Sequence, residues 1–166
     1  MRQALSGAIT TGSLMLLAGA LGVGLGQPLL FPSLGPTAFL LAENPPPPSA
    51  RPYNVLAGHG VGIIAGFAGV LATGAASVPA VFSAHLLSPE RVLAAALAIM
   101  LTYLGTTVLR AQHPPAAATT LLIALGGFRP DLSHAATIMV GVVVVTVVGE
   151  GLRRARQGEL RLARSA

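Results

Sequence analysis

The sequence predicts an all-α membrane protein with four full transmembrane helices and two shorter helices opened by prolines. Of its 166 residues, 53% are hydrophobic and only 9% are charged, and the mean hydropathy is +0.75. Soluble domains carry about 25% charged residues. Four apolar runs are each long enough to cross a hydrocarbon core about 30 Å thick. Two further apolar runs are bounded by prolines or glycines and are too short to cross alone.

The charged residues point to a membrane surface rather than to a nucleic acid. The net charge is +5, but aromatic residues make up only 4% of the chain. Half of the ten basic residues follow the last apolar run, where arginines beside a span help to set its orientation. Cysteine is absent, which excludes disulfides, thiolate metal sites and thiol redox chemistry.

The first two full spans carry small residues at every fourth position. They cover residues 4–26 and 54–77. Such a stripe lets another helix approach closely, although glycine is also common in membrane helices in general. The positions are Ala18, Gly22 and Gly26 in the first span, and Gly58, Gly62 and Gly66 in the second.

Residues 27–53 interrupt this pattern of full spans. Pro36 opens a helix there, and Pro45, the first of four consecutive prolines, ends it after about two turns. At an offset of 82 residues the segment aligns with the second short helix, and the matched pairs are Thr37 with Thr119, Leu40 with Leu122, and Ala42 with Ala124. The order span, half-helix, span then occurs twice, which predicts two parallel repeats.

The second short helix begins at Pro114 and Pro115, because proline in the first turn needs no partner for its missing N–H. Glycines at 126 and 127 end it. From Pro115 to Leu125 it would be about 16 Å long, half of a hydrocarbon core. Such a helix is tolerated at membrane depth only where its flank is buried in protein or lines a water-filled cavity. We therefore expect both short helices to be re-entrant segments.

The remaining elements follow in order. Residues 78–90 form a short connection in which Ser88 caps the next helix. The third span, residues 90–110, carries hydroxyls that either bond to their own helix or line a pore, and these are Thr102, Tyr103, Thr106 and Thr107. A polar turn leads to the fourth span, residues 134–152. We expect one transmembrane domain over residues 1–152 and a basic cytoplasmic tail over 153–166, as a surface helix or as a disordered segment.

Arginine counting gives an expected orientation. With four spans, the side of the two termini holds seven arginines, including Arg2, Arg91 and five in the tail, against three on the opposite side. The positive-inside rule then places both termini in the cytoplasm of a multi-pass protein of the cell inner (plasma) membrane. Both half-helices would enter from the outer side.

The two half-helices and a histidine predict a site for a small inorganic anion. A helix N-terminus offers free N–H groups and about half a positive charge, and His113 lies at the start of the second half-helix. A cation site would need a carboxylate or a ring of carbonyls, whereas no Asp or Glu lies in the interior of a predicted span and Glu150 sits at a cytoplasmic end. The candidate binding residues are His113, Pro114, Pro115, Thr119, Thr120, Ser33, Gly35, Thr37, Asn54, His59 and Arg110.

Three sequence blocks resemble the HPP family of integral membrane proteins. The triplet His113-Pro114-Pro115 with its Ala-Ala-Ala-Thr-Thr sequel resembles the signature that names the family, and residues 31–38 and 50–59 resemble two further blocks. The resemblance covers residues 4–152 and implies a four-span membrane domain. It also implies nitrite as the first candidate substrate, since some members in chloroplasts and cyanobacteria are associated with nitrite transport. The chain departs from the second block where Arg51 precedes Pro52 and Tyr53 precedes Asn54.

Two other classes of function stay open at this point. A scaffold or accessory subunit would use the half-helices as structure, with His113 bonded to a backbone carbonyl. A membrane enzyme or metal protein is disfavoured, because the four histidines lack the spacing of a zinc motif; they are His59, His85, His113 and His134. We therefore expect no enzyme activity, no cofactor and no metal. The glycine stripes predict a homo-oligomer in a lipid bilayer.

Overall fold

All secondary structure in the described part of the chain is helical. The computed structural model describes the backbone of residues 1–165 and the side chains of residue 1 and residues 3–155. The α-helices are α1 (Arg2–Leu25), α2 (Leu34–Ala42), α3 (Pro52–Ala72), α4 (Val81–Ala84), α5 (Pro89–Val108), α6 (Pro115–Ala124) and α7 (Leu132–Ser165). Two 3-10 turns, η1 (Pro48–Ala50) and η2 (Ala75–Ser77), lie beside α3. The predicted all-α class is confirmed.

Four helices are long and apolar enough to span a membrane, as predicted. The candidate spans are Gln3–Leu25, Pro52–Ala72, Pro89–Val108 and Leu132–Ala155. Local chemistry explains their ends: Gly26 adopts a left-handed conformation after α1, and the Ser88 hydroxyl accepts a hydrogen bond from the Arg91 N–H at the start of α5. The helix of the fourth span does not end at residue 152 but continues to Ser165. The predicted roles of Arg156, Arg161 and Arg164 fall on side chains outside the described part.

The two short helices occur where the prolines predict them. Helix α6 begins at Pro115 and has 10 residues, or about 15 Å. Helix α2 has 9 residues, or about 14 Å, and begins at Leu34, two residues before Pro36. The earlier start is allowed because proline is tolerated anywhere in the first helical turn, where its missing N–H has no intrahelical partner.

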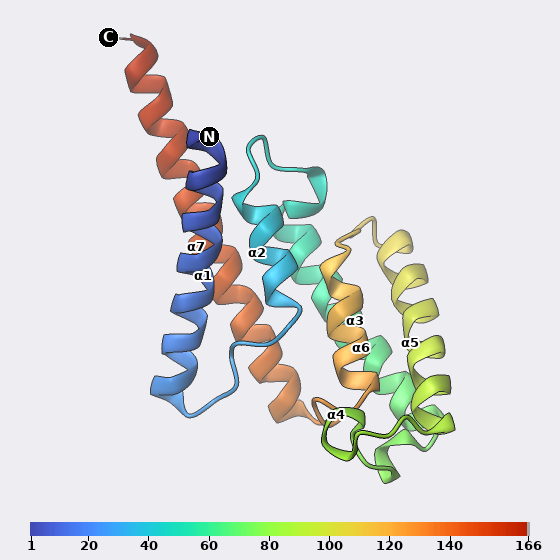
Figure 1. Ribbon diagram of the computed structural model, residues 1–166. Coiled ribbons are helices and arrows are strands. Elements are labelled where there is room, and N and C mark those ends of the chain that lie inside the picture. The colour runs from blue at the N-terminus through green and yellow to red at the C-terminus, as the bar shows by residue number, and fades with distance from the viewer. Residues whose placement is uncertain (166) are drawn as a thin grey trace.

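The short helices run in opposite directions, and the predicted parallel repeats are wrong. The Gln3 side chain donates to the Asn44 carbonyl, so α2 ends where α1 begins (Figure 1), at what we call the N-terminal end. Helix α6 instead begins at this end and finishes at the far end, where the Val81 N–H donates to the Leu125 carbonyl. Taken in order, α1, α2 and α3 therefore each run opposite to their counterparts α5, α6 and α7.

The short helices also do not return to the end from which their segment starts, as a re-entrant segment would. Residues 26–33 lead from the far end to α2, and residues 125–131 lead from α6 to the start of α7 at the far end. Eight extended residues reach up to about 26 Å, which with the 14 Å of α2 exceeds a 30 Å hydrocarbon core. A half-helix with an extended loop can therefore link opposite ends, which proline spacing alone does not reveal.

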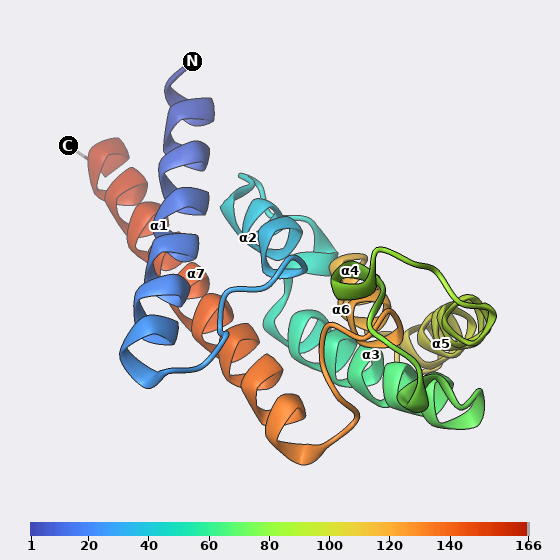
Figure 2. The same cartoon turned by 60° about the horizontal axis from the view of Figure 1, so that its bottom comes forward.

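The long and short helices form two groups. Each group contains two helices from one half of the sequence and one long helix from the other half. Helices α1, α2 and α7 pack together, and α3, α5 and α6 pack together (Figure 2). The α3 glycine stripe seats α6: a Cβ at Gly62 would lie 2.8 Å from the Ala116 carbonyl oxygen, and one at Gly66 would lie 2.9 Å from Ile123 Cβ. The predicted packing role of this stripe is confirmed. Close packing on α3 fixes the height of α6 in the molecule.

Arg91 is buried at the far end, which corrects its predicted place among the surface charges beside the termini. Its side chain is 5% exposed. The guanidinium donates three hydrogen bonds to backbone carbonyls. Two are in the connection between η2 and α4, at 3.3 Å to Pro79 and 2.8 Å to Val78, and one is in the last residue of α6, at 3.0 Å to Ala124. It thereby ties the last turn of α6 to the connection between α3 and α5.

Candidate functional site

Five buried polar side chains meet in the middle of the fold, and we call them the histidine–hydroxyl cluster. They come from α3 and from the two short helices, α2 and α6, with the turns that precede them. Each is at most 3% exposed. The members are Ser33, Thr37, His59, His113 and Thr119.

The cluster is joined by short hydrogen bonds. Thr37 Oγ1 lies 3.0 Å from His59 Nε2 and 3.1 Å from His113 Nε2, so one hydroxyl bridges the two imidazoles. His59 Nδ1 lies 2.7 Å from Thr119 Oγ1, which in turn lies 2.6 Å from Ser33 Oγ. The centres of the two imidazole rings are 5.0 Å apart. The two short helices therefore meet through Ser33 to Thr119 and through Thr37 to His113.

A backbone carbonyl holds His113 from its other side. His113 Nδ1 lies 2.8 Å from the Ser49 oxygen in η1. Because a carbonyl can only accept, Nδ1 carries a hydrogen. Sequence patterns could not reveal this contact, since any residue at position 49 presents the same backbone oxygen.

Thr120 belongs to a second hydroxyl pair beside the cluster. Its Oγ1 lies 2.7 Å from Thr102 Oγ1 and donates towards the Ala116 carbonyl at 3.1 Å. The Thr102 hydroxyl has one hydrogen, which points either to Thr120 or to the Ala98 carbonyl of its own helix. This pair joins α5 to α6 beside the cluster, and the Ala98 carbonyl is the own-helix partner that the sequence predicted for Thr102.

The start of α6 does not offer the free N–H groups that the sequence predicted. Pro114 and Pro115 have no N–H, and the next two N–H groups donate to the His113 and Pro114 carbonyls at 2.9 and 3.0 Å. At α2 the Leu34 N–H likewise donates to the Phe31 carbonyl at 3.0 Å. Turns at the two helix starts thus use the N–H groups of Leu34, Ala116 and Ala117. Donors for a ligand must therefore come mainly from side chains.

Two neighbouring cavities lead from the N-terminal end towards His113. The inner cavity, of about 350 Å³, lies between α5 and α6 and is lined by His113, Thr102, Thr106, Thr107 and Gln112, among others. The outer cavity, of about 440 Å³, is lined by Pro48, Ser49, Asn54, Thr107, Arg110 and Gln112. Thr107 and Gln112 line both. His113 thus has one face in the cluster and one at the inner cavity.

The other predicted site residues lie around this path. Asn54 donates to the Gln112 carbonyl at 3.1 Å and Arg110 is exposed, so both belong to the outer cavity. Pro114 lines the inner cavity and Pro115 is buried in α6. Gly35 is half-buried in the first turn of α2, and a Cβ added there would have nothing within 4 Å. It makes no contact that places it in the site.

The remaining histidines do not join the cluster. His85 is exposed beyond α4, and His134 bonds with Asp131 at 2.7 Å at the start of α7. The Asp131 carboxylate also accepts from the His134 backbone N–H, and this bond leads the causes that lower the pKa of Asp131. Among the described residues, no three His, Cys, Asp or Glu side chains gather where they could hold one metal ion.

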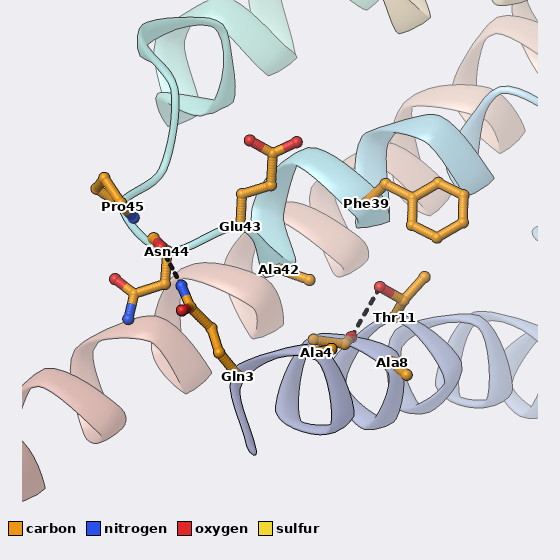
Figure 3. Close-up of a pocket in the computed structure, with 10 residues that line it drawn as sticks. Gln3, Ala4, Ala8, Thr11, Phe39, Ala42, Glu43, Asn44 and Pro45 are labelled. Carbon is orange, nitrogen blue, oxygen red and sulfur yellow. Dashed lines mark hydrogen bonds between the residues drawn. The ribbon is translucent and has the colours of Figure 1, made fainter. Parts of the chain in front are cut away.

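A further cavity, of about 660 Å³, lies at the N-terminal end between α1 and α2 (Figure 3). Gln3, Thr11, Phe39 and Glu43 line it together with small residues. The Gln3 side chain reaches across it to the Asn44 carbonyl. Among the described side chains that line it, the one charged group is the carboxylate of Glu43, which would repel an anion. This cavity is therefore the weaker candidate for an anion site.

Comparison with known proteins supports the resemblance seen in the sequence. Neither a curated protein nor a solved structure matches the chain. A family model described as "HPP, transmembrane region" matches residues 1–159. The match includes every helix that supplies the cluster and both short helices. The chain is therefore a membrane protein of the HPP family.

Proposed function

We propose that the chain is a membrane channel or transporter for a small inorganic anion, with nitrite as the first candidate. The observation that carries the proposal is the position of His113, which bonds to the cluster and also borders the inner cavity. Hydroxyl and amide donors line the same cavity, and the carboxylates of the described residues lie elsewhere. An anion there would meet donors and no negative side chain.

The path to His113 also suits an anion by charge and by size. Arg110 stands exposed at the outer cavity, where a positive charge raises the local concentration of anions. At about 30 Å³ per water, the inner cavity of about 350 Å³ would hold an anion with part of its hydration shell. An anion about 4 Å from a positive charge gains about 4 kcal/mol at an effective dielectric constant of 20. That gain is comparable to the desolvation penalty of an ion.

The orientation in the membrane is part of the proposal. Helix directions place Arg2, Arg51, Arg110, Arg153 and Arg154 towards the N-terminal end, and Arg91 and Arg129 at the far end. The positive-inside rule then puts the N-terminal end, with both termini, in the cytoplasm. Because the chain has no cysteine, a single introduced cysteine is a unique label. Ser83→Cys should react with an impermeant maleimide on intact cells, and Asn44→Cys only after lysis; the opposite result would reverse the orientation.

A homo-oligomer is also proposed. Large apolar side chains of α5 remain exposed in the single chain, where they suit lipid or a second copy. Mass measurement of the purified protein in detergent tests this directly. A mass of one chain at all concentrations would contradict the oligomer.

The test of the main proposal is nitrite flux into proteoliposomes at matched protein incorporation. Empty liposomes must be subtracted because nitrous acid crosses bilayers unaided. We expect saturable flux that His113→Ala abolishes and His85→Ala leaves unchanged, since His85 is exposed far from the cluster. Chloride, nitrate and formate as competitors rank the substrates.

A non-transporting scaffold or accessory subunit is the second candidate, and one observation favours it. Every buried side-chain nitrogen and oxygen of the described residues has a hydrogen-bond partner, as expected of a structural polar core. Under this alternative, folded protein would give a flux equal to that of empty liposomes for every anion. That result would overturn the transport proposal.

A further inference from the structure

The hydrogen bonds of the cluster form a continuous path between two serines. In order, it joins Ser33 Oγ, Thr119 Oγ1, both nitrogens of His59, Thr37 Oγ1, both nitrogens of His113 and the Ser49 carbonyl. Its links measure 2.6, 2.7, 3.0, 3.1 and 2.8 Å. Each interior member is a hydroxyl or an imidazole, and both groups can accept one proton while releasing another.

The Ser49 carbonyl fixes the direction of every bond when both histidines are neutral. Because His113 Nδ1 carries its hydrogen towards that carbonyl, His113 Nε2 must accept from the Thr37 hydroxyl. Thr37 has then used its one hydrogen and accepts from His59 Nε2.

The same reasoning continues beyond His59. With its hydrogen on Nε2, neutral His59 accepts at Nδ1 from Thr119, which accepts from Ser33. Thr37 Oγ1 also lies 3.0 Å from the Ser33 carbonyl, but a hydrogen directed there would leave the buried His113 Nε2 without a donor. All donors thus point from Ser33 to His113.

We propose that this path is a proton relay, and that one proton moves onto His113 when an anion occupies the inner cavity. The inference rests on the proposed anion transport. A hydronium ion that reaches the buried Ser33 Oγ gives it a proton, and Ser33 releases its own to Thr119, which releases its own to His59 Nδ1. His59 gives up the Nε2 hydrogen to Thr37, and Thr37 gives its former hydrogen to His113 Nε2. Each O–H or N–H bond that breaks is replaced by one that forms, and every donor between Ser33 and His113 Nε2 now points the opposite way, while His113 Nδ1 still donates to the Ser49 carbonyl.

The surroundings of His113 make the added proton depend on the anion. The ionisable side chains that face it from the packed elements are His59 of α3 and Tyr103 of α5, which lines the inner cavity; α2, α5 and α6 also present threonine hydroxyls, and Arg110 stands at the outer cavity. The described carboxylates lie at the ends of the molecule, at Glu43, Glu90, Asp131 and Glu150. The counter-charge for an imidazolium must therefore come from an anion in the inner cavity. By linkage, anion binding and protonation then strengthen each other.

The geometry also limits the uptake to one proton per chain. The two imidazole rings lie 5.0 Å apart, and a second positive charge at that distance strongly opposes the first. Thr37 can donate to only one of the two rings at a time. The pair therefore holds one extra proton at most.

Stopped-flow mixing with a pH-sensitive dye tests the relay. Purified protein in weakly buffered detergent at pH 7 is mixed with sodium nitrite, and a protein-free blank is subtracted. The wild type should take up as much as one proton per chain, and His113→Gln should take up none. Thr37→Val and Thr119→Val each remove one link, so they should slow uptake about a hundredfold or more. Thr37→Ser, which keeps the hydroxyl, should restore the wild-type rate.

A matched control and a parallel flux assay separate the outcomes. Thr146→Val changes a buried threonine that donates to the Val142 carbonyl within α7, and it should leave the rate unchanged. If the wild type carries nitrite but takes up no proton, or if Thr37→Val is as fast as the wild type, the relay is overturned and transport stands. If the wild type gives neither flux nor proton uptake, transport and relay both fail.

Discussion

Gly62 offers a sharp test of how α6 is seated on α3. A Cβ added at Gly62 would lie 2.8 Å from the Ala116 carbonyl oxygen and 3.0 Å from Thr120 Oγ1, whereas ordinary contacts begin near 3.4 Å. The backbone of α6 must therefore move by about half an ångström. Overpacking of this kind costs about 1–3 kcal/mol, and alanine in a helix recovers about 0.5–1 kcal/mol relative to glycine. We expect Gly62→Ala to lower the free energy of unfolding by about 1–2 kcal/mol.

The same helix supplies the control. A Cβ at Gly60 would have nothing within 4 Å, so Gly60→Ala should be neutral or stabilising by up to about 1 kcal/mol. For a chain of this size, 1 kcal/mol shifts Tm by about 2–4 °C. Thermal unfolding in detergent, followed by circular dichroism at helical wavelengths, should therefore show a lower Tm for Gly62→Ala and an equal or higher one for Gly60→Ala. Equal Tm values for the two variants would refute the close contact between α3 and α6.

Two further predictions concern the far end of the molecule. Arg91→Gln should lower the free energy of unfolding by about 2–4 kcal/mol, because it leaves buried carbonyls without donors; the exposed Arg129→Gln should change it little, and equal thermal unfolding of the two variants would contradict this role. The pKa of Asp131 is lowered chiefly by the His134 backbone N–H, so its contribution to stability is present above its usual pKa near 3.9 and is lost as the pH falls below it. The difference in Tm between wild type and Asp131→Asn should accordingly shrink between pH 7 and pH 3, and a difference independent of pH would rule this contribution out.

Much of the fold follows from residue types that act locally. Prolines at 36, 45 and 115 define the two short helices, and α6 begins at Pro115 as predicted. The glycine stripe at Gly58, Gly62 and Gly66 identifies the face of α3 that receives another helix. Proline and glycine act through their own backbone geometry, so their effect can be read without knowing the partner.

The direction of the short helices depended on information that local patterns do not contain. A loop of eight residues can either return to one end or cross half of the molecule, and its composition is compatible with both. The burial of Arg91 is similar, because its three acceptors are backbone carbonyls from segments distant in the sequence. The sequence alone does not tell whether an arginine next to a helix start is buried, as Arg91 is, or exposed on the surface.

The candidate site was predicted in its members but not in its bonding. His113, Thr37 and Thr119 were predicted because they lie near the starts of two short helices, and all three are in the cluster. The donors expected from free N–H groups are instead used within the turns at Pro114 and Pro115. Whether an N–H is free depends on how the chain folds back before the helix, which residue type alone does not determine.

The wide sequence separation within the cluster has a consequence for how the protein is made. Ser33 and Thr119 are 86 residues apart, so at about 5–20 residues per second the ribosome needs about 4–17 s to supply the second after the first. During that interval part of the polar partners of Ser33 and Thr37 do not yet exist. Thr37 can meanwhile donate to the Ser33 carbonyl one turn earlier, a bond that needs no later residue. The first short helix therefore carries its own temporary partner, and the cluster can close only once α6 has been synthesised.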